Sequence, residues 1–352
     1  MAERYRKHVY CEKKFLEHCI KTIAEWKFCE ESFEELRLWM CIKALIFSPD
    51  IVLHLDISND DLPQFNGPKS QKVFSAWAIE LAQMQSEQKI HLKLGDFVTP
   101  ETINKSDNKQ LTAYYLTCCD CETCQQCMDE CGVLAICPEN IKDFTSILYD
   151  NGMAINRKGK AEWKKIINCS PCLCNSLILV DNYIFNDFKL LDDNLKQILD
   201  ALLPKSLDTD IPFQISVFTT LKKGNAKNDI DSQDCLKKIA ILVEQLRPEL
   251  YFKLAIFKCS FEKFHDRIII TNNTYISCGG GFDLIKDGKS EKSTTLNYVF
   301  PFFYKTAKWD SMAYSNFLNG VKDNYDKATE FKADYLTGFF VGSKTNRLIT
   351  QC

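Results

Sequence analysis

The side chains best suited to chemistry lie in one stretch, FHDRIIITNNTYISCGGGFD, at residues 264–283. A histidine, an arginine, an asparagine and a glycine pair follow one another there in the pattern H-x-R-x4-N-x6-G-G. A histidine can attack or protonate a phosphorus centre, an arginine fork can hold phosphate oxygens, and glycines let the backbone approach a ligand. The pattern predicts a phosphate site whose catalytic candidates are His265, Arg267 and Asn272 and whose ligand-binding candidates include Gly279 and Gly280.

The elements that must position this site are strands of a larger sheet. Side chains two positions apart share one face of a strand, so His265 and Arg267 can point together into a cleft. Strand-like and helix-like segments alternate around them: strands at 176–181, 214–220, 251–257 and 274–278, and helices at 191–202 and 232–247. This alternation predicts an α/β fold, with a mixed sheet that carries helices on both faces, for residues 175–352.

The N-terminal region, residues 1–116, has the same α/β character. Apolar residues recur at helical spacing in two segments before residue 47 and again over 73–84. Short apolar runs at 51–55 and 90–94 are typical of buried strands. Residues 117–174 interrupt the alternation with cysteines, polar residues and turn signals, so they are interpreted as a metal-binding insertion between two α/β parts.

Eighteen cysteines are many for 352 residues, and ten of them fall within this insertion. Clustered cysteines in a reducing compartment indicate a metal site rather than disulfides. The predicted ligands are Cys118, Cys121, Cys124, Cys127, Cys131, Cys169, Cys172 and Cys174. We expect zinc, because two separated cysteine knuckles closing on one ion is ordinary structural zinc geometry and gives the second cluster a role.

Two alternatives to zinc stay open. The run C-x2-C-x2-C-x3-C at 121–131 has the spacing of a bacterial ferredoxin, which would hold an iron–sulfur cluster, although Gly132 stands where proline usually follows. The other alternative is a cysteine-rich loop without metal.

A basic segment, NRKGKAEWKK at 156–165, lies between the cysteine clusters. Its lysines Lys158, Lys160 and Lys164 surround Trp163, and cations interleaved with an aromatic ring suit contact with phosphates and bases. They are therefore further ligand-binding candidates. The alternative is a solvated helix face.

The stretch 265–283 resembles the phospholipase D-like domain at the C-terminus of microtubule-interacting and trafficking domain proteins. That family has an HDR strand, a polar turn, a second strand, and a glycine-x-glycine followed by an aromatic residue or leucine and an aspartate. Here Gly279-Gly280-Gly281-Phe282-Asp283 stands at that end. Residues 176–203 are similar to the opening strand and helix of the domain, so the resemblance covers about 175–330 and implies a phospholipase D-like fold.

The resemblance also bears on activity. Catalytic members of the superfamily combine two half-sites, each with histidine, usually lysine, and commonly aspartate, whereas this chain has Arg267 and Asn272 and one complete pattern. A second candidate, His91-x-Lys93, lacks the following amide and glycines. An enzyme of this type would have to act as a homodimer, and the related domains bind membranes or partner proteins. Phosphate binding is therefore favoured over turnover.

Composition limits the remaining classes. The net charge is −3, which gives no global attraction to nucleic acid or anionic membranes, so any such contact needs a local patch. The charged start has no secretory signal, and the longest apolar runs are too short to cross a bilayer, which predicts an intracellular, cytoplasmic protein.

Three functions compete on these grounds. The first is a phosphate-binding, phospholipase D-like module that recognises nucleic acid or another phosphodiester, with a bacterial antiviral defence system as one setting. The second is an active histidine-dependent nuclease or phosphodiesterase working as a dimer. The third is a catalytically inactive scaffold for a protein partner.

Overall fold

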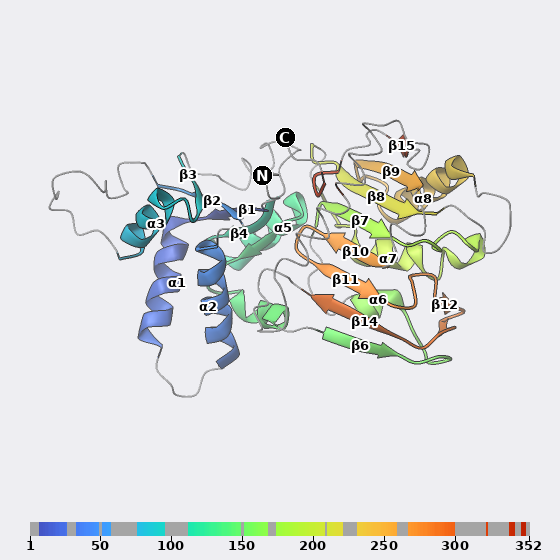
Figure 1. Cartoon of the computed structure of the whole chain (residues 1–352), viewed down its shortest axis with the longest axis horizontal. Helices are drawn as coiled ribbons and strands as arrows, with labels where there is room; N and C mark the ends of the chain where they lie inside the picture. The colour runs from blue at the N-terminus through green and yellow to red at the C-terminus, as the bar shows by residue number, and fades with distance from the viewer. Residues whose placement is uncertain are drawn as a thin grey trace.

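The computed structural model describes residues 7–26, 33–48, 51–57, 76–95, 112–148, 151–167, 174–207, 210–220, 231–258, 267–299, 322, 338–341 and 346–349. Within these ranges the chain forms a five-stranded sheet, an eight-stranded sheet and a two-stranded ribbon, with helices packed on the two larger sheets (Figure 1). The predicted α/β class and mixed sheet are thereby confirmed. No helix in the described ranges is long and apolar enough to cross a bilayer.

The five-stranded sheet is parallel throughout, in the order β3-β2-β1-β4-β5. Its strands are β1 (Lys7–Cys11), β2 (Ile51–Leu55), β3 (His91–Leu94), β4 (Thr112–Leu116) and β5 (Leu134–Ile136). Its helices are α1 (Lys13–Glu25), α2 (Phe33–Ile46), α3 (Ala76–Ser86) and α5 (Cys121–Cys131). The strand order reverses at β1, so the carboxyl ends of β1 and β4 meet at a topological switch point, where open α/β sheets commonly bind ligands.

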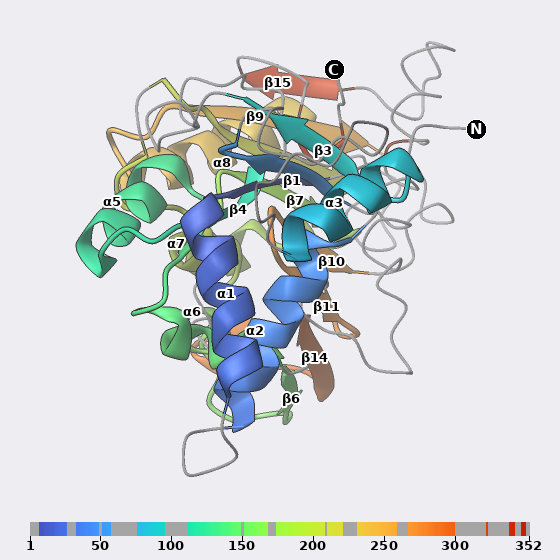
Figure 2. The same ribbon diagram turned by 90° about the vertical axis from the view of Figure 1, so that its left-hand side faces the viewer.

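Helices α1 and α2 form an antiparallel pair that leads away from this sheet, side by side in both views (Figures 1 and 2). Their apolar residues recur at helical spacing, which buries Phe15 and Leu16 of α1 against Leu38 and Trp39 of α2. The rings of Phe15 and Trp39 lie 5.6 Å apart. The two helices predicted before residue 47 are therefore confirmed.

The eight-stranded sheet has the order β15-β9-β8-β7-β10-β11-β14-β6. Its parallel centre consists of β7 (Ser176–Val180), β8 (Phe213–Thr219) and β9 (Phe252–Lys258). Antiparallel strands flank it: β10 (Ile268–Thr271), β11 (Tyr275–Cys278), β14 (Thr294–Val299), β6 (Asn151–Ile155) and β15 (Gly338–Val341). The associated helices are α6 (Trp163–Ile167), α7 (Leu195–Leu202) and α8 (Ser232–Leu246), with the 3-10 turn η3 (Phe188–Leu190). The 3-10 turn η2 (Ile141–Leu148) packs instead against α2.

The central strands are rich in apolar residues because most of their side chains are buried. Every residue of β7, β8 and β10 is buried, as expected for strands covered on both sides. The ribbon β12 (Ile285–Lys286) and β13 (Lys289–Ser290) protrudes before β14. The cysteine-rich segment contributes to both sheets, with α5 and β5 in the first and β6 in the second.

The two sheets meet where α5 ends. Gly132 closes α5 in a left-handed conformation (φ +64°), and its amide donates to the carbonyl of Met128. A Cβ atom at this position would lie 2.6 Å from the carbonyl oxygen of Cys174, so only glycine allows this close approach. Beside it, the Asn175 side chain donates to the carbonyl of Cys131 at 2.9 Å.

Candidate functional site

The candidate site lies at the amino-terminal end of β10. Strand β10 runs antiparallel to β7, with Ile268 opposite Val180, so Arg267 lies beside Asp181 at the carboxyl end of β7. Asn272 follows the other end of β10. An extended chain rises about 3.3 Å per residue, which places Arg267 and Asn272 about 16 Å apart. The structure therefore does not bring these two predicted catalytic residues together.

Asn272 is fully buried and holds the start of β7. Its Oδ1 accepts from the backbone amides of Asn175 at 3.2 Å and Ser176 at 3.1 Å, and its Nδ2 donates to the side-chain oxygen of Asn175 at 2.8 Å. These structural hydrogen bonds are sufficient to account for an asparagine at this position. The structure gives Asn272 no place in the pocket that contains Arg267.

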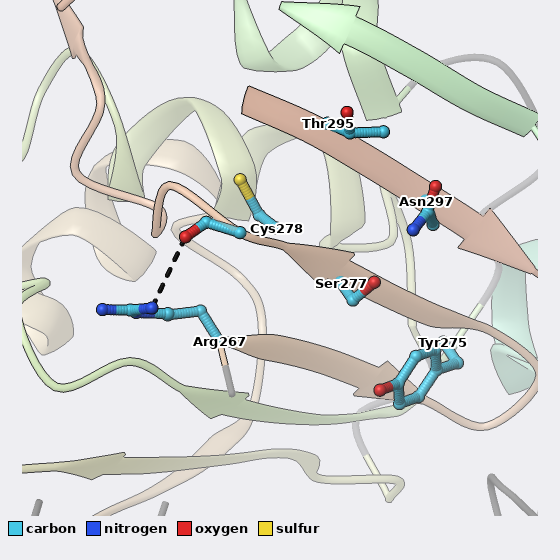
Figure 3. A pocket seen from close by; sticks show the side chains of 7 residues that line it. Arg267, Tyr275, Ser277, Cys278, Thr295 and Asn297 are labelled. Atoms are coloured by element: carbon cyan, nitrogen blue, oxygen red, sulfur yellow. Dashed lines mark hydrogen bonds between the residues drawn. The ribbon is translucent and has the colours of Figure 1, made fainter. Parts of the chain in front are cut away.

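Arg267 points along the end of the sheet toward the glycine turn (Figure 3). Its guanidinium lies 5.4 Å from the ring centre of Tyr183, and one terminal nitrogen donates to the carbonyl of Gly279 at 3.4 Å. Its Nε is buried and has no hydrogen-bond partner among the described residues. An unpaired buried donor costs about 1–3 kcal/mol, so an acceptor oxygen from a ligand would relieve this cost.

A pocket of about 630 Å³ opens beside this arginine. Figure 3 shows Arg267 and Tyr275 at its two ends. Between them, Ser277 of β11 lies directly opposite Asn297 of β14, so a hydroxyl and an amide share one face of the sheet. The intervening Ile276 is fully buried on the opposite face. The complete lining is Arg267, Tyr275, Ser277, Cys278, Gly279, Thr295 and Asn297.

The pocket residues on β11 and β14 were missed in the sequence, although a signal was present. In YISC and TTLNYV, polar residues alternate with buried apolar ones, which is typical of a strand with one accessible face. What the sequence did not reveal is that these two strands are neighbours.

The glycine turn is held by a buried carboxylate, Asp181. Its two oxygens accept from the backbone amides of Tyr183 at 2.8 Å and Phe282 at 2.5 Å. Burial raises the pKa of Asp181 to about 6, and the nearby charge of Arg267 acts in the opposite direction. Gly281 has φ +89°, and a Cβ atom there would lie 3.3 Å from Asp181 Oδ2. Asp181 therefore positions the turn that brings Gly279 to the pocket.

The predicted ligand-binding residues differ in their surroundings. Gly279 is exposed and lines the pocket, Gly280 follows it, and His265 lies outside the described residues. Lys158 and Lys160 are exposed, whereas Lys164 pairs with Asp200 at 2.9 Å.

The predicted partnership of these lysines with an aromatic ring is wrong. Trp163 is fully buried, and its indole nitrogen donates to Asn194 Oδ1 at 2.8 Å. Its ring is therefore not accessible to a base.

The cysteines of α5 do not gather around one point. Cys121 and Cys131 begin and end an 11-residue helix, so they lie about 15 Å apart along its axis and cannot both bind one compact cluster while it is intact. This geometry opposes the ferredoxin-like alternative. Two close thiol pairs occur instead, with sulfur–sulfur distances of 3.9 Å for Cys121–Cys137 and 3.7 Å for Cys127–Cys131.

The other predicted zinc ligands are also dispersed. The Cys174 thiol is buried and donates to the carbonyl of Leu202 at 3.4 Å, while Cys118 is exposed after β4. Partial desolvation of its sulfur, followed by the charge of the Glu12 carboxylate, raises the pKa of the Cys118 thiol to about 11. Among the described side chains, no group of three or more histidines, cysteines or acids is placed to hold a metal. Cys169 and Cys172 lie outside those residues, so zinc stays a prediction.

The switch point of the five-stranded sheet is occupied by Glu12, which follows β1. Its carboxylate accepts from the Tyr115 hydroxyl at 2.9 Å, the Thr117 hydroxyl and the Cys118 amide at 2.8 Å. The residues after β1 read Glu-Lys-Lys, not the glycine-rich turn that lets a dinucleotide phosphate approach. This crevice is therefore filled by the protein's own side chain.

No protein-family model matches the chain, and no curated protein matches its sequence. The geometry around Arg267 is therefore the main indication of function.

Proposed function

We propose that this protein is a phosphate-binding, phospholipase D-like module that recognises nucleic acid or another phosphodiester through Arg267. The observation that carries the proposal is that Arg267 lines a pocket and that its buried Nε has no partner in the described residues. A phosphate oxygen is the acceptor that an arginine fork fits best, because two parallel hydrogen bonds can form to one anion.

The rest of the pocket offers polar partners to a phosphate ester. Hydroxyl and amide groups of Ser277, Thr295 and Asn297 supply donors and acceptors, and Gly279 leaves its backbone accessible. A volume of about 630 Å³ lies within the usual range for small-ligand sites, which is about 300–1,000 Å³. One nucleotide-sized group therefore fits the pocket.

The order of elements supports the phospholipase D-like assignment. Strand β10, the turn at Asn272–Thr274, strand β11 and the glycines 279–281 follow one another as in the family that the sequence resembles. Before them, three parallel strands are connected by helices α7 and α8.

Recognition is favoured over hydrolysis because the pocket lacks one expected catalytic group. Asn272 is buried at the far end of β10, where its contacts with Asn175 and Ser176 hold the start of β7. Cleavage by His265 in a dimer remains the second hypothesis, and the same binding experiment can be followed for product formation with His265→Ala as its control.

The test compares wild type with three variants for binding of the dinucleotide TpT by calorimetry or by NMR titration. We expect Arg267→Ala to weaken TpT binding about 10- to 100-fold, because a charge-assisted hydrogen bond contributes about 1.5–3 kcal/mol. Arg267→Lys should retain part of the affinity. The control Lys237→Ala removes one charge from an exposed site on α8 and should bind as wild type. Equal affinity of wild type and Arg267→Ala would refute the proposal.

A further inference from the structure

Two segments far apart in the sequence are joined next to the pocket. The loop after β6 and the ribbon β12–β13 exchange backbone hydrogen bonds: Lys158 N to Ser290 O at 2.7 Å, Ser290 N to Gly159 O at 3.0 Å, and Ala161 N to Gly288 O at 3.0 Å. Lys160 and Lys289 also form an isolated β-bridge. The two segments therefore form one surface.

This surface carries a cluster of cations, which we call the cationic edge. Its members are all exposed and are Arg157, Lys158, Lys160, Lys286, Lys289 and Lys292. Three acids, Asp283, Asp287 and Glu291, lie in the same segments, which leaves an excess of three positive charges. Within the described part of the chain, Lys292 is the one member that forms an ion pair, with Asp283 at 3.6 Å.

The cationic edge is continuous with the pocket. Lys292 Nζ donates to the carbonyl of Gly280 at 3.3 Å, next to the pocket residue Gly279. On the other side, the Arg157 amide donates to Ser293 Oγ at 3.0 Å, two residues before the pocket residue Thr295. A ligand leaving the pocket past the glycine turn therefore meets this edge directly.

We propose that a single-stranded nucleic acid binds across both regions. One phosphate contacts Arg267, the adjoining base enters the pocket beside Tyr275 and the polar pair Ser277–Asn297, and neighbouring phosphates lie along the cationic edge. The inference deepens the proposed function and depends on it for the Arg267 contact. Tyr275 takes the role that the sequence assigned to Trp163.

The chemistry of the pocket favours a single strand over a duplex or a membrane. Bases of a single strand are free to stack on an aromatic ring and to hydrogen-bond through their edges with side-chain amides and hydroxyls. In a duplex those bases are paired, and a bilayer surface has none. Alternating phosphates and bases thus match a cationic edge that adjoins a polar pocket with an aromatic ring.

Fluorescence anisotropy with the full chain and labelled oligothymidylates of 2 and 12 residues tests the inference. We expect the 12-mer to bind at least tenfold more tightly than the dinucleotide, with affinity that falls steeply as salt rises. Lys158→Gln/Lys289→Gln should weaken 12-mer binding about tenfold and leave dinucleotide binding unchanged. Losing two phosphate contacts should also make the slope of log affinity against log salt concentration shallower by about 1.4, at about 0.7 per contact for single strands.

A matched control, Lys205→Gln/Lys237→Gln, removes two exposed charges from outside the cationic edge and should behave as wild type. Equal binding of the two lengths, or equal losses in both double variants, overturns the inference. The inference is also overturned if a 12-base-pair duplex binds more tightly than the single-stranded 12-mer. Binding to phosphatidylserine vesicles overturns it too, if the 12-mer does not compete with the vesicles.

The two proposals fail in different ways. If dinucleotide binding depends on Arg267 while length and the cationic edge have no effect, the proposed function stands and this inference falls. If the 12-mer depends on the cationic edge but not on Arg267, the phosphate site at Arg267 is refuted. If neither ligand binds, both are refuted.

Discussion

The two large sheets present the same kind of position, the carboxyl ends of parallel strands, and use it in opposite ways. In the five-stranded sheet, Glu12 fills the switch point and accepts three hydrogen bonds from the protein itself. In the eight-stranded sheet, the corresponding end holds Arg267, whose buried Nε has no partner in the described residues and which opens onto a pocket. Topology indicates where a ligand can bind, but the pairing of the buried polar groups decides whether the place is vacant.

The largest expected effect comes from removing Glu12, the side chain that distinguishes the two sheet ends. Glu12→Ala leaves buried donors on Tyr115, Thr117 and Cys118 unpaired, and we expect a loss of about 4 kcal/mol in the free energy of unfolding, measured in urea. Arg267→Ala should lose less than about 1 kcal/mol, since it removes a donor that is already unpaired in part. Comparable losses in both variants would mean that the two sheet ends do not differ in this respect.

The second effect concerns pH at the end of the eight-stranded sheet. Burial raises the folded-state pKa of Asp181 from 3.8 to about 6, so the folded state retains a proton there that the unfolded state has lost. Its stabilising contribution is therefore complete below about pH 4 and is lost as pH rises through about 6. Relative to Asp181→Asn, wild type should lose on the order of 3 kcal/mol between pH 4 and 7. Parallel pH profiles of unfolding for the two proteins would contradict this assignment.

A smaller effect should distinguish two glycines of the same turn, Gly281 and Gly279. Gly281→Ala introduces a Cβ 3.1 Å from Asp283 Oδ1 at φ +89°, and we expect a loss of about 1–2 kcal/mol together with weaker TpT binding. At Gly279 a Cβ would meet only a hydroxyl of Thr294 at 3.4 Å, so Gly279→Ala should cost less than about 0.5 kcal/mol. Thermal unfolding of both variants shows whether stability depends on the conformation of the turn at Gly281 or only on the presence of glycines in it.

The smallest effect on stability is expected at the thiols near the five-stranded sheet. Cys121 is one of the predicted zinc ligands, so Cys121→Ser should lower the zinc content in elemental analysis. After chelation, the same variant should differ from wild type by less than about 0.5 kcal/mol, because Cys121 is exposed. Purified wild type without zinc would end this prediction, and absorption near ~400 nm would indicate iron–sulfur instead.

Much of the local structure could be predicted because local patterns encode it. Helical spacing of apolar residues predicted α1, α2 and α8, and continuous apolar runs predicted β2, β7 and β9. Around the site, Arg267 and Gly279, which the sequence predicted as a catalytic and a ligand-binding residue, both line the pocket. A basic residue before a strand and glycines after the next strand are readable signals, whereas the predicted roles stay predictions.

The sequence by itself thus determined the α/β class, most strands and helices, and one end of the candidate site. Only the tertiary structure decided that β11 and β14 are neighbours, that Lys158 and Lys289 share a surface, and that Trp163 and Asn272 are internal. The physical reason is that periodicity and turn chemistry act over a few residues. Strand pairing and burial instead depend on segments that lie far outside that range, 20 positions apart for Ser277 and Asn297 and 129 for Lys160 and Lys289. Their meeting leaves no local pattern in either segment.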